Sequence, residues 1–311
     1  MANKPQGSLV NNNHLKRRCF QGGFFILFIS APILDIFRFD LNLGHFIIFG
    51  YPWTLGLDAL IAGQDTPAEG VLNIILRGFV PLASLVLLAG WVAWKYGRLY
   101  CGWLCPHFSV VETINRLMRR ASGKFSLWDK DLLATTSLDG KPIPQNKIYW
   151  LLVTLAVIAF AFLWAVVLIT YLLPPSEIYG NLFSGQLTRN QAVFIGVGTF
   201  LLVIEFMFAR HLFCRFGCAV GVFQSFLWMA NRKAMVVSFD RSRASACKDC
   251  NNACDDACPM RLKPRSIKRK MFTCTQCSEC LSTCEQVQLK YNEAPILRWK
   301  SAEDALKESD R

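Results

Sequence analysis

Two groups of four cysteines near the C-terminus constrain this chain more than any other feature of its sequence. Of its 13 cysteines in 311 residues, eight lie between positions 247 and 284. The first group reads Cys247-Lys-Asp-Cys250-Asn-Asn-Ala-Cys254-Asp-Asp-Ala-Cys258-Pro259, and the second reads Cys274-Thr-Gln-Cys277-Ser-Glu-Cys280-Leu-Ser-Thr-Cys284. Thiols crowded this closely along short loops predict a segment that folds around a bound metal group.

The spacing is close to the bacterial ferredoxin run C-x2-C-x2-C-x3-C-P, in which the fourth cysteine ligates the partner cluster. The second group has these gaps but ends in Cys284-Glu285, and the first has the proline but one extra residue before Cys254. If the crossing holds, the sequence predicts two [4Fe–4S] clusters. Cluster 1 would use Cys247, Cys250, Cys254 and Cys284, and cluster 2 would use Cys274, Cys277, Cys280 and Cys258.

A zinc module and a disulfide scaffold are the alternatives for these eight cysteines. Zinc modules usually separate two C-x2-C knuckles by roughly 12–20 residues and do not place four cysteines in one loop. Disulfides require an oxidising compartment, and the charge pattern described below predicts a reducing one. Iron–sulfur ligation is therefore the interpretation that the spacing favours.

The composition indicates a membrane protein, since 53% of residues are apolar and 18% are charged. A helix that crosses a bilayer core of about 30 Å needs roughly 20 apolar residues. Four segments are long enough: 19–37, 71–94, 148–173 and 191–209. We therefore expect an α-helical membrane protein with four transmembrane helices in two repeated hairpins, and a small cytoplasmic α+β two-cluster ferredoxin-like module.

The net charge of +12 is unevenly distributed and predicts the orientation in the membrane. Basic residues gather between the second and third spans, at Lys95, Arg98, Arg116, Arg119, Arg120, Lys124 and Lys130. By the positive-inside rule, both termini and the clusters lie in the cytoplasm of a bacterial cell, and the protein is a multi-pass protein of the inner membrane. The basic excess thus reflects topology, and no nucleic-acid partner is expected.

An internal repeat divides the chain. Cys101-Gly-Trp-Leu-Cys105-Pro106 returns as Cys214-Arg-Phe-Gly-Cys218-Ala219, 113 positions later, after the second apolar pair. The expected organisation is a cytoplasmic polar tail (1–17), a first hairpin with the CxxxCP motif (18–120), a cytoplasmic loop (121–146), a second hairpin with the CxxxC motif (147–233), a ferredoxin-type domain with two clusters (242–290) and a polar tail (291–311).

The two C-x3-C pairs are candidate redox or metal sites. On one helix, positions i and i+4 share a face, so Cys101 and Cys105, like Cys214 and Cys218, would point the same way. Four converging thiols suit Cu(I), a further cluster or a dithiol relay, and the alternative is four cysteines that pack as small apolar residues. Asp35, Arg77 and Glu205 lie in the expected spans and are candidates for a quinol or proton site, with an interfacial position as the alternative. His107 and His211 flank the C-x3-C motifs and are candidates for a metal or quinol site.

Paired hairpins ending in C-x3-C motifs, followed by a two-cluster module, resemble the NapH/MauN polyferredoxin family. That family includes the quinol dehydrogenase subunit of periplasmic nitrate reduction. The stretch 218–240 is also similar to the FixG/RdxA/CcoG cytochrome oxidase accessory proteins, a group linked to Cu(II) reduction. The chain departs from the pattern at Ala219, where proline is usual, and at the extra residue before Cys254.

The resemblance implies a membrane-anchored iron–sulfur protein that passes single electrons between the quinol pool or a cytoplasmic donor and a membrane or periplasmic redox partner complex. Quinol would be the substrate, and membrane lipid a further partner. An alternative is a Cu(II) reductase or oxidase assembly factor that uses the C-x3-C pairs, and a third is a non-catalytic iron–sulfur sensor. The sequence leaves open whether the chain itself is an enzyme or an electron-transfer component of a quinol dehydrogenase-like oxidoreductase or a metal reductase.

Overall fold

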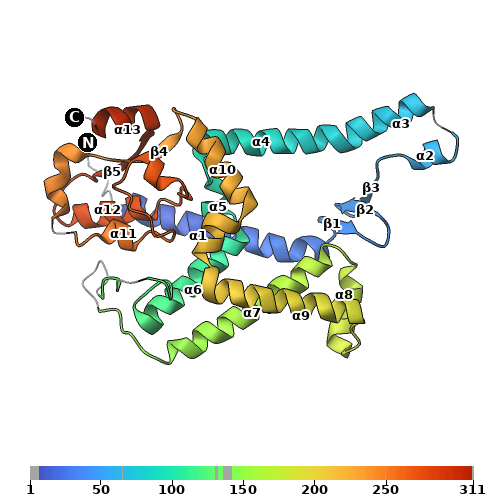
Figure 1. Cartoon of the computed structure of the whole chain (residues 1–311), viewed down its shortest axis with the longest axis horizontal. Helices are drawn as coiled ribbons and strands as arrows, with labels where there is room; N and C mark the ends of the chain where they lie inside the picture. The colour runs from blue at the N-terminus through green and yellow to red at the C-terminus, as the bar shows by residue number, and fades with distance from the viewer. Residues whose placement is uncertain (1–6, 65, 130–131, 136–141, 249, 310–311) are drawn as a thin grey trace. The chain divides into compact units, whose positions relative to one another are not determined.

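The computed structural model describes residues 7–64, 66–129, 132–135, 142–248 and 250–309 (Figure 1). Lys130, part of the expected loop 121–146, and the outermost positions of both expected tails lie outside these residues. The chain forms two compact units. Unit 1 comprises Met1–Phe25, Val92–Ile158 and Ile204–Arg311, and unit 2 comprises Ile26–Trp91 and Ala159–Val203. Each expected hairpin therefore contributes to both units.

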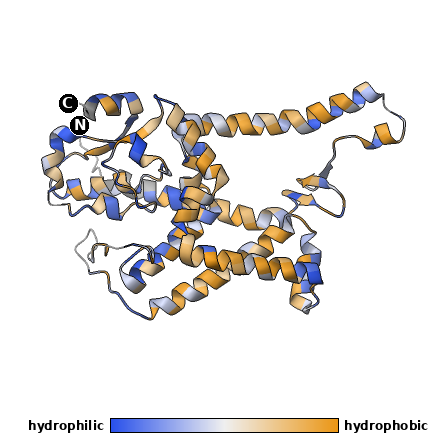
Figure 2. Ribbon diagram, viewed as in Figure 1, coloured by the Kyte–Doolittle hydropathy of each residue, from blue (hydrophilic) through white to orange (hydrophobic). Residues whose placement is uncertain are grey.

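Among the described residues, three helices are long and apolar enough to cross a membrane. They are Pro67–Tyr96, Tyr149–Thr170 and Arg189–Ala209. The first joins α3 (Pro67–Ile74), η1 (Ile75–Phe79) and α4 (Val80–Tyr96), the second is α7, and the third joins α9 (Arg189–Ile204) and η2 (Glu205–Ala209). Apolar residues predominate along α4, α7 and α9 (Figure 2).

The fourth expected span, at 19–37, is not confirmed. It begins in α1 (Gly7–Ile33), but this helix ends four residues before Phe37, which starts strand β1. The charged run Lys16-Arg17-Arg18 lies within the same helix, so the apolar part of α1 is shorter than the roughly 20 residues that a span requires. The expected N-terminal polar tail, 1–17, is helical from Gly7 onward, because α1 begins there.

Unit 2 has an antiparallel sheet and a small apolar core. The sheet has the order β1 (Phe37–Asp40), β2 (His45–Ile48), β3 (Tyr51–Trp53). The unit also contains α2 (Asp58–Ile61) and α8 (Pro175–Ser184). The core combines Ala165, Val166 and Ile169 of α7 with Ile178 of α8 and Ile195 of α9.

Unit 1 combines helices with a two-stranded antiparallel sheet of β4 (Met235–Phe239) and β5 (Leu297–Ser301). Its main core includes Phe108, Trp228, Val236, Cys258 and Ala302, all buried. The further helices of this unit are α5 (Leu99–Trp103), α6 (Pro106–Ser122), η3 (Phe213–Gly217), α10 (Ala219–Ala230), η4 (Arg241–Cys247), α11 (Ala253–Asp256), η5 (Lys268–Met271), α12 (Glu279–Leu289) and α13 (Ala302–Ser309).

The expected C-terminal polar tail is instead folded from Leu297 onward. β5 pairs with β4 over five residues, with Leu297 opposite Phe239, and α13 follows directly. Leu297 shares a buried cluster with Val237, Cys254 and Cys280. The end of the chain therefore closes the core beside the cysteine loops.

We expect Leu297→Ala to destabilise unit 1 by about 2–5 kcal/mol, because Leu297 is 3% exposed and its truncation opens a cavity beside Cys254. Anaerobic thermal unfolding, followed by loss of bound iron, measures the effect. Leu306→Ala in α13 is the matched control, since Leu306 is 50% exposed and should cost much less. Equal losses in the two variants would contradict the placement of β5 in the core.

Candidate metal centre

The eight C-terminal cysteines line two cavities, with four in each. Cavity A is lined by Cys258, Cys274, Cys277 and Cys280. Cavity B is lined by Cys247, Cys250, Cys254 and Cys284. Each cavity thus takes three cysteines from one sequence group and one from the other. Cys258 and Cys284 are the residues that cross between the groups.

Left-handed residues wind the cysteine loops around the cavities. Asn251 and Asn252 have φ values of 44° and 57°, and Gln276 and Ser278 have values of 55° and 61°. Asparagine occupies this region more readily than most residues do. α11 begins after Asn252 and α12 after Ser278, so both loops lead into a short helix that carries the next cysteine. We attribute the extra residue before Cys254 to the consecutive pair Asn251–Asn252.

The donor set of both cavities is purely thiol. In the described residues, no carboxylate or imidazole lines either cavity. Within the same residues, no three His, Cys, Asp or Glu side chains are arranged to hold a single metal ion. Soft thiol donors of this kind suit the iron of an iron–sulfur cluster, so the residues present fit that group.

Burial disfavours ionisation of these thiols on their own. It raises the pKa of Cys254 and Cys277 to about 12, and the nearby Asp255 adds to the effect at Cys254. A bound cation would offset this penalty, because it stabilises the thiolate form directly. At Cys258 the backbone also favours the thiolate form, since the N–H of Leu262 donates to its Sγ at 3.4 Å.

The C-x3-C motifs cross helix breaks, and the expectation that each pair shares one helix face is wrong. Cys101 lies in α5, but Cys105 is the N-cap of α6, with Pro106 at its first position. Proline favours a helix start and disrupts a helix interior, which explains the break. In the second motif Cys214 lies in η3 and Cys218 is the N-cap of α10, so the break persists with Ala219 in place of proline.

The structure nevertheless brings the four C-x3-C thiols into one neighbourhood. Burial, together with the charges of Cys105 and Cys218, raises the pKa of Cys101 to about 12. The pKa of Cys214 is raised by burial and by the proximity of Cys105, Cys101 and Cys218. The two pairs therefore lie close to each other across the sequence repeat.

This neighbourhood adjoins cavity A. Cys105, Cys214 and Cys274 pack against the same core cluster, to which Cys258 belongs. The guanidinium of Arg98, buried beside them, interacts electrostatically with three of the C-x3-C thiols and with Cys274. A cavity A ligand and the C-x3-C thiols thus surround one buried cation.

Backbone contacts fix the first motif on the loop of cavity A. A Cβ added to Gly102 would lie 2.2 Å from the carbonyl oxygen of Thr275, so only glycine permits this approach. Next to it, Trp103 Nε1 donates to the carbonyl oxygen of Gln276 at 3.1 Å. The second motif is tied in through Arg98, whose Nη1 donates to the carbonyl oxygen of Cys214 at 2.7 Å.

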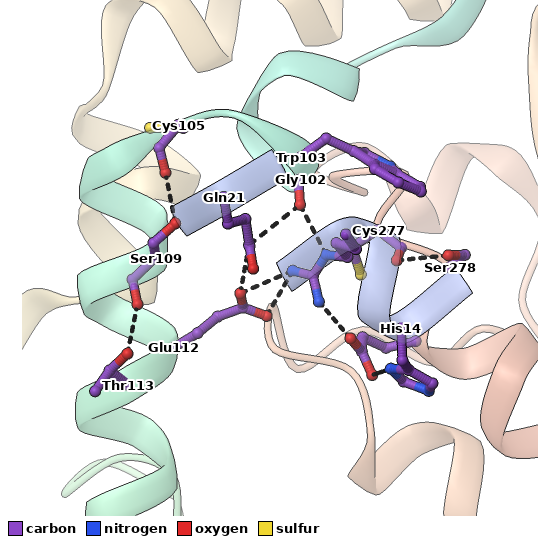
Figure 3. A network of polar contacts seen from close by, with 12 residues as sticks. His14, Gln21, Gly102, Trp103, Cys105, Ser109, Glu112, Thr113, Cys277 and Ser278 are labelled. Carbon is purple, nitrogen blue, oxygen red and sulfur yellow. Dashed lines mark hydrogen bonds and ion pairs between the residues drawn. The ribbon is translucent and has the colours of Figure 1, made fainter. Parts of the chain in front are cut away.

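A buried polar network spans the same region (Figure 3). Arg17 of α1 donates through Nη2 to both carboxylate oxygens of Glu112 at 2.7 and 2.8 Å, and through Nε to the carbonyl oxygen of Gly102 at 2.8 Å. It also forms an ion pair with Glu279, next to Cys280. Burial alone would lower the pKa of Arg17, but the charges of Cys277, Glu112 and Glu279 raise it above its usual value.

Arg17 is not among the candidate site residues that the sequence predicts. Its partners are distant in sequence, but Gln21, one turn further along α1, also donates to Glu112, at 2.8 Å. Two polar residues at i and i+4, at the start of the apolar part of α1, are a signal that could have indicated a buried polar face.

The other candidate residues form a second polar group. His107 Nε2 lies 3.2 Å from Glu205 Oε1, so the structure brings these two together. His211 is buried, and its Nδ1 has no hydrogen-bond partner among the described residues. Burial lowers the pKa of His211 to about 4, so this imidazole is neutral near pH 7.

Comparison with known proteins identifies the same region. The model of a 4Fe-4S binding domain matches the chain twice, at residues 77–124 and 190–235. Each match encloses one C-x3-C motif, and neither reaches the ferredoxin-like segment 247–284. No solved structure matches the chain.

Three curated proteins are similar to this chain in sequence. The ferredoxin-type protein NapH of Escherichia coli (strain K12) is 26% identical over 88% of this chain and 86% of its own length. The methylamine utilization ferredoxin-type protein MauN of Paracoccus denitrificans (strain Pd 1222) is 25% identical over 79% of this chain and 75% of its own. The putative electron transport protein YccM of E. coli (strain K12) is 23% identical over 73% of this chain, which spans 57% of that relative.

The apolar helices, the thiol-lined cavities and these matches define a class, the iron–sulfur electron-transfer proteins of membranes. Within that class, the chain is similar to the ferredoxin-type proteins NapH and MauN, which confirms the resemblance seen in its sequence.

The approach of Gly102 to Thr275 can be tested by a single methyl group. We expect Gly102→Ala to destabilise unit 1 by about 1–3 kcal/mol, since α5 must shift away from the cavity A loop. Gly23→Ala in α1 is the control, because its Cβ would meet nothing within 4 Å. Thermal unfolding and iron retention of both variants measure the difference, and equal stability would contradict the contact.

Proposed function

We propose that this protein moves single electrons between a donor and a redox partner complex through two [4Fe–4S] clusters and the C-x3-C site. The observation that carries the proposal is the grouping of eight thiols around two cavities, one of which adjoins the four C-x3-C thiols. When bound, the clusters supply one-electron redox chemistry. The chain supplies ligands, burial and a fixed position for each group.

The proposed ligands follow the cavities. Cys258, Cys274, Cys277 and Cys280 would hold one cluster in cavity A, and Cys247, Cys250, Cys254 and Cys284 would hold the other in cavity B. The left-handed loop residues turn the thiols inward, and the buried apolar lining excludes water from the ligands. Arg17 places a positive charge near Cys277, which would stabilise negative charge on the cluster in cavity A.

Pairs of substitutions distinguish crossed from uncrossed ligation. If Cys258 and Cys277 hold the same cluster, Cys258→Ser/Cys277→Ser should remove one cluster and retain about four irons. Cys284→Ser/Cys277→Ser should damage both clusters and lose nearly all the iron, because Cys284 lines the other cavity. Iron analysis after anaerobic purification measures both. The opposite ranking would establish uncrossed ligation.

The C-x3-C site is proposed as the exit point or the acceptor site for these electrons. Its four cysteines are half-buried and lie in one neighbourhood. Burial raises the pKa values of Cys101, Cys105 and Cys214, so a bound soft metal would be needed to hold these three as thiolates. Cu(I), a further iron–sulfur cluster and a redox-active dithiol pair all suit this donor set. The same thiol set favours Cu(II) reduction as a second candidate function.

We expect Cys101→Ser/Cys105→Ser to leave roughly eight irons on the ferredoxin-type cysteines, which supply all ligands of those clusters. Electron delivery should fall by about tenfold or more, since a hydroxyl replaces a soft ligand. Reoxidation of the reduced protein by a quinone analogue and by Cu(II) measures delivery. The Cys214→Ser/Cys218→Ser variant should act alike, and Cys19→Ser, at an exposed position, is the control.

If reoxidation by both oxidants is unchanged, the four C-x3-C cysteines have only a packing role. Loss for Cu(II) alone would select the copper candidate, and loss for the quinone alone would select the quinol-linked function. Bound iron that neither oxidant reoxidises would favour the third candidate, a non-catalytic sensor.

We propose that the protein lies in a bacterial inner membrane with both termini and both clusters on the cytoplasmic side. The three apolar helices and the basic residues after α4 and after α9 support this orientation. α1 would then act as a shorter fourth anchor with its basic run on the cytoplasmic side. Quinol or a cytoplasmic protein remains the proposed donor, and membrane lipid surrounds the spans.

Reporter fusions test this topology. Fusions after Arg120 and after the last residue should be active only with cytoplasmic reporters, and a fusion at Asn181 in α8 should be active only with a periplasmic reporter. The reverse pattern would place the cysteines in an oxidising compartment and contradict the orientation.

A further inference from the structure

A cavity of about 620 Å³ in unit 1 plays no part in the proposed electron route. Its size is in the range typical of small-ligand sites. It lies between α1, α6 and the loops that flank Cys258 and Cys280, and it is lined by Arg17, Arg18, Gln21, Glu112, Thr113, Asn115, Arg116, Leu117, Arg119, Arg120, Phe125, Ile143, Asp256, Ala257, Pro259 and Glu279.

The lining has an excess of positive charge, with five arginines against three carboxylates. Glu112 and Glu279 are both paired with Arg17. The third carboxylate, Asp256, accepts a hydrogen bond from the backbone N–H of Ala134 at 3.0 Å. Because Glu112 and Glu279 both pair with Arg17, the α6 arginines Arg116, Arg119 and Arg120 give this side of the cavity an excess of positive charge.

The α6 arginines of this cavity retain unused donors. Arg119 Nη2 donates to the carbonyl oxygen of Ala134 at 3.1 Å, but its buried Nε has no hydrogen-bond partner among the described residues. Arg116 Nε makes one long contact of 3.4 Å, to the backbone carbonyl oxygen of Glu112 on its own helix. The planar guanidinium presents five donors, so both side chains keep capacity for a ligand.

Asn115 is the second, independent observation. Its side chain is 3% exposed and lines the cavity, and in the described part of the chain neither Nδ2 nor Oδ1 has a hydrogen-bond partner. A buried polar group without a partner costs about 1–3 kcal/mol. A ligand in the cavity would give Nδ2 an acceptor.

We propose that this cavity binds a phosphate group, with Asn115 Nδ2, Arg119 Nε and the Arg116 guanidinium as donors. Several planar guanidinium forks around one space match the geometry and charge of a phosphate dianion better than those of a single carboxylate. The phosphate comes either from a membrane phospholipid head group or from a free phosphorylated molecule. Arg18, exposed at the rim, adds positive charge where either would enter.

The test uses the full-length protein with its iron bound, in detergent, and inorganic pyrophosphate as the probe. Isothermal titration should show saturable binding to the wild type. Asn115→Leu and Arg116→Gln should each weaken it by about tenfold or more, since each removes a donor to a charged ligand. Arg116 is exposed, so its variant keeps the test valid if Asn115→Leu does not fold. Arg269→Gln, an equal charge change outside the cavity, should bind as the wild type does.

A second arm identifies the source of the phosphate. Short-chain phosphatidylglycerol below its micelle concentration is titrated against bound pyrophosphate. Competition assigns the cavity to lipid head groups, and its absence assigns it to free phosphates. No saturable pyrophosphate binding to the wild type, or equal weakening by Arg269→Gln, would overturn the proposal. Because the readout is binding and iron content is measured separately, failure here is independent of the electron-transfer proposal.

Discussion

The close approach of α5 to the loop of cavity A is the contact on which the arrangement of unit 1 depends. Gly102 lacks a side chain, so the backbone of α5 lies directly against Thr275, and Trp103 adds a hydrogen bond to Gln276. Cys101 lies one residue before this glycine, and Cys274 one residue before this threonine. The contact thus sets how near the C-x3-C thiols lie to the thiols of cavity A, and electron transfer between them would require that proximity.

Buried arginines hold this contact in place from two sides. Arg17 binds Glu112, Glu279 and the carbonyl oxygen of Gly102, whereas Arg98 binds the carbonyl oxygen of Cys214 and the hydroxyl of Ser225. Buried ion pairs contribute little net stability, because desolvation offsets their attraction, but the loss of one partner is costly. Their main effect here is therefore positional, as they join α1, α6 and both C-x3-C motifs to one loop.

The sequence predicts best where the signal is local. Cysteine spacing indicated an iron–sulfur module because the ligands of a cluster come from one short loop, and hydropathy identified the three long apolar helices. The repeated C-x3-C motifs, followed by the two cysteine groups, indicated the resemblance that the comparisons confirm. The cysteine module and each apolar helix are encoded within about 40 residues.

The errors arise where partners are far apart in the chain. The C-terminal segment resembled a polar tail because β5 is short and gains its place only by pairing with β4, some 60 residues earlier. The role of Arg17 was not predicted, because its partners Glu112 and Glu279 lie 95 and 262 residues away. Within the C-x3-C motifs, the i, i+4 rule failed because Cys105 and Cys218 are helix caps and not interior residues.

The most direct test of the account is the metal content of the anaerobically purified protein, combined with EPR after dithionite reduction. Two [4Fe–4S] clusters predict at least about eight irons and about eight acid-labile sulfides per chain, with spin-coupled S = 1/2 signals in the reduced state. Stoichiometric zinc without sulfide, in a protein that has no visible absorbance, would contradict it.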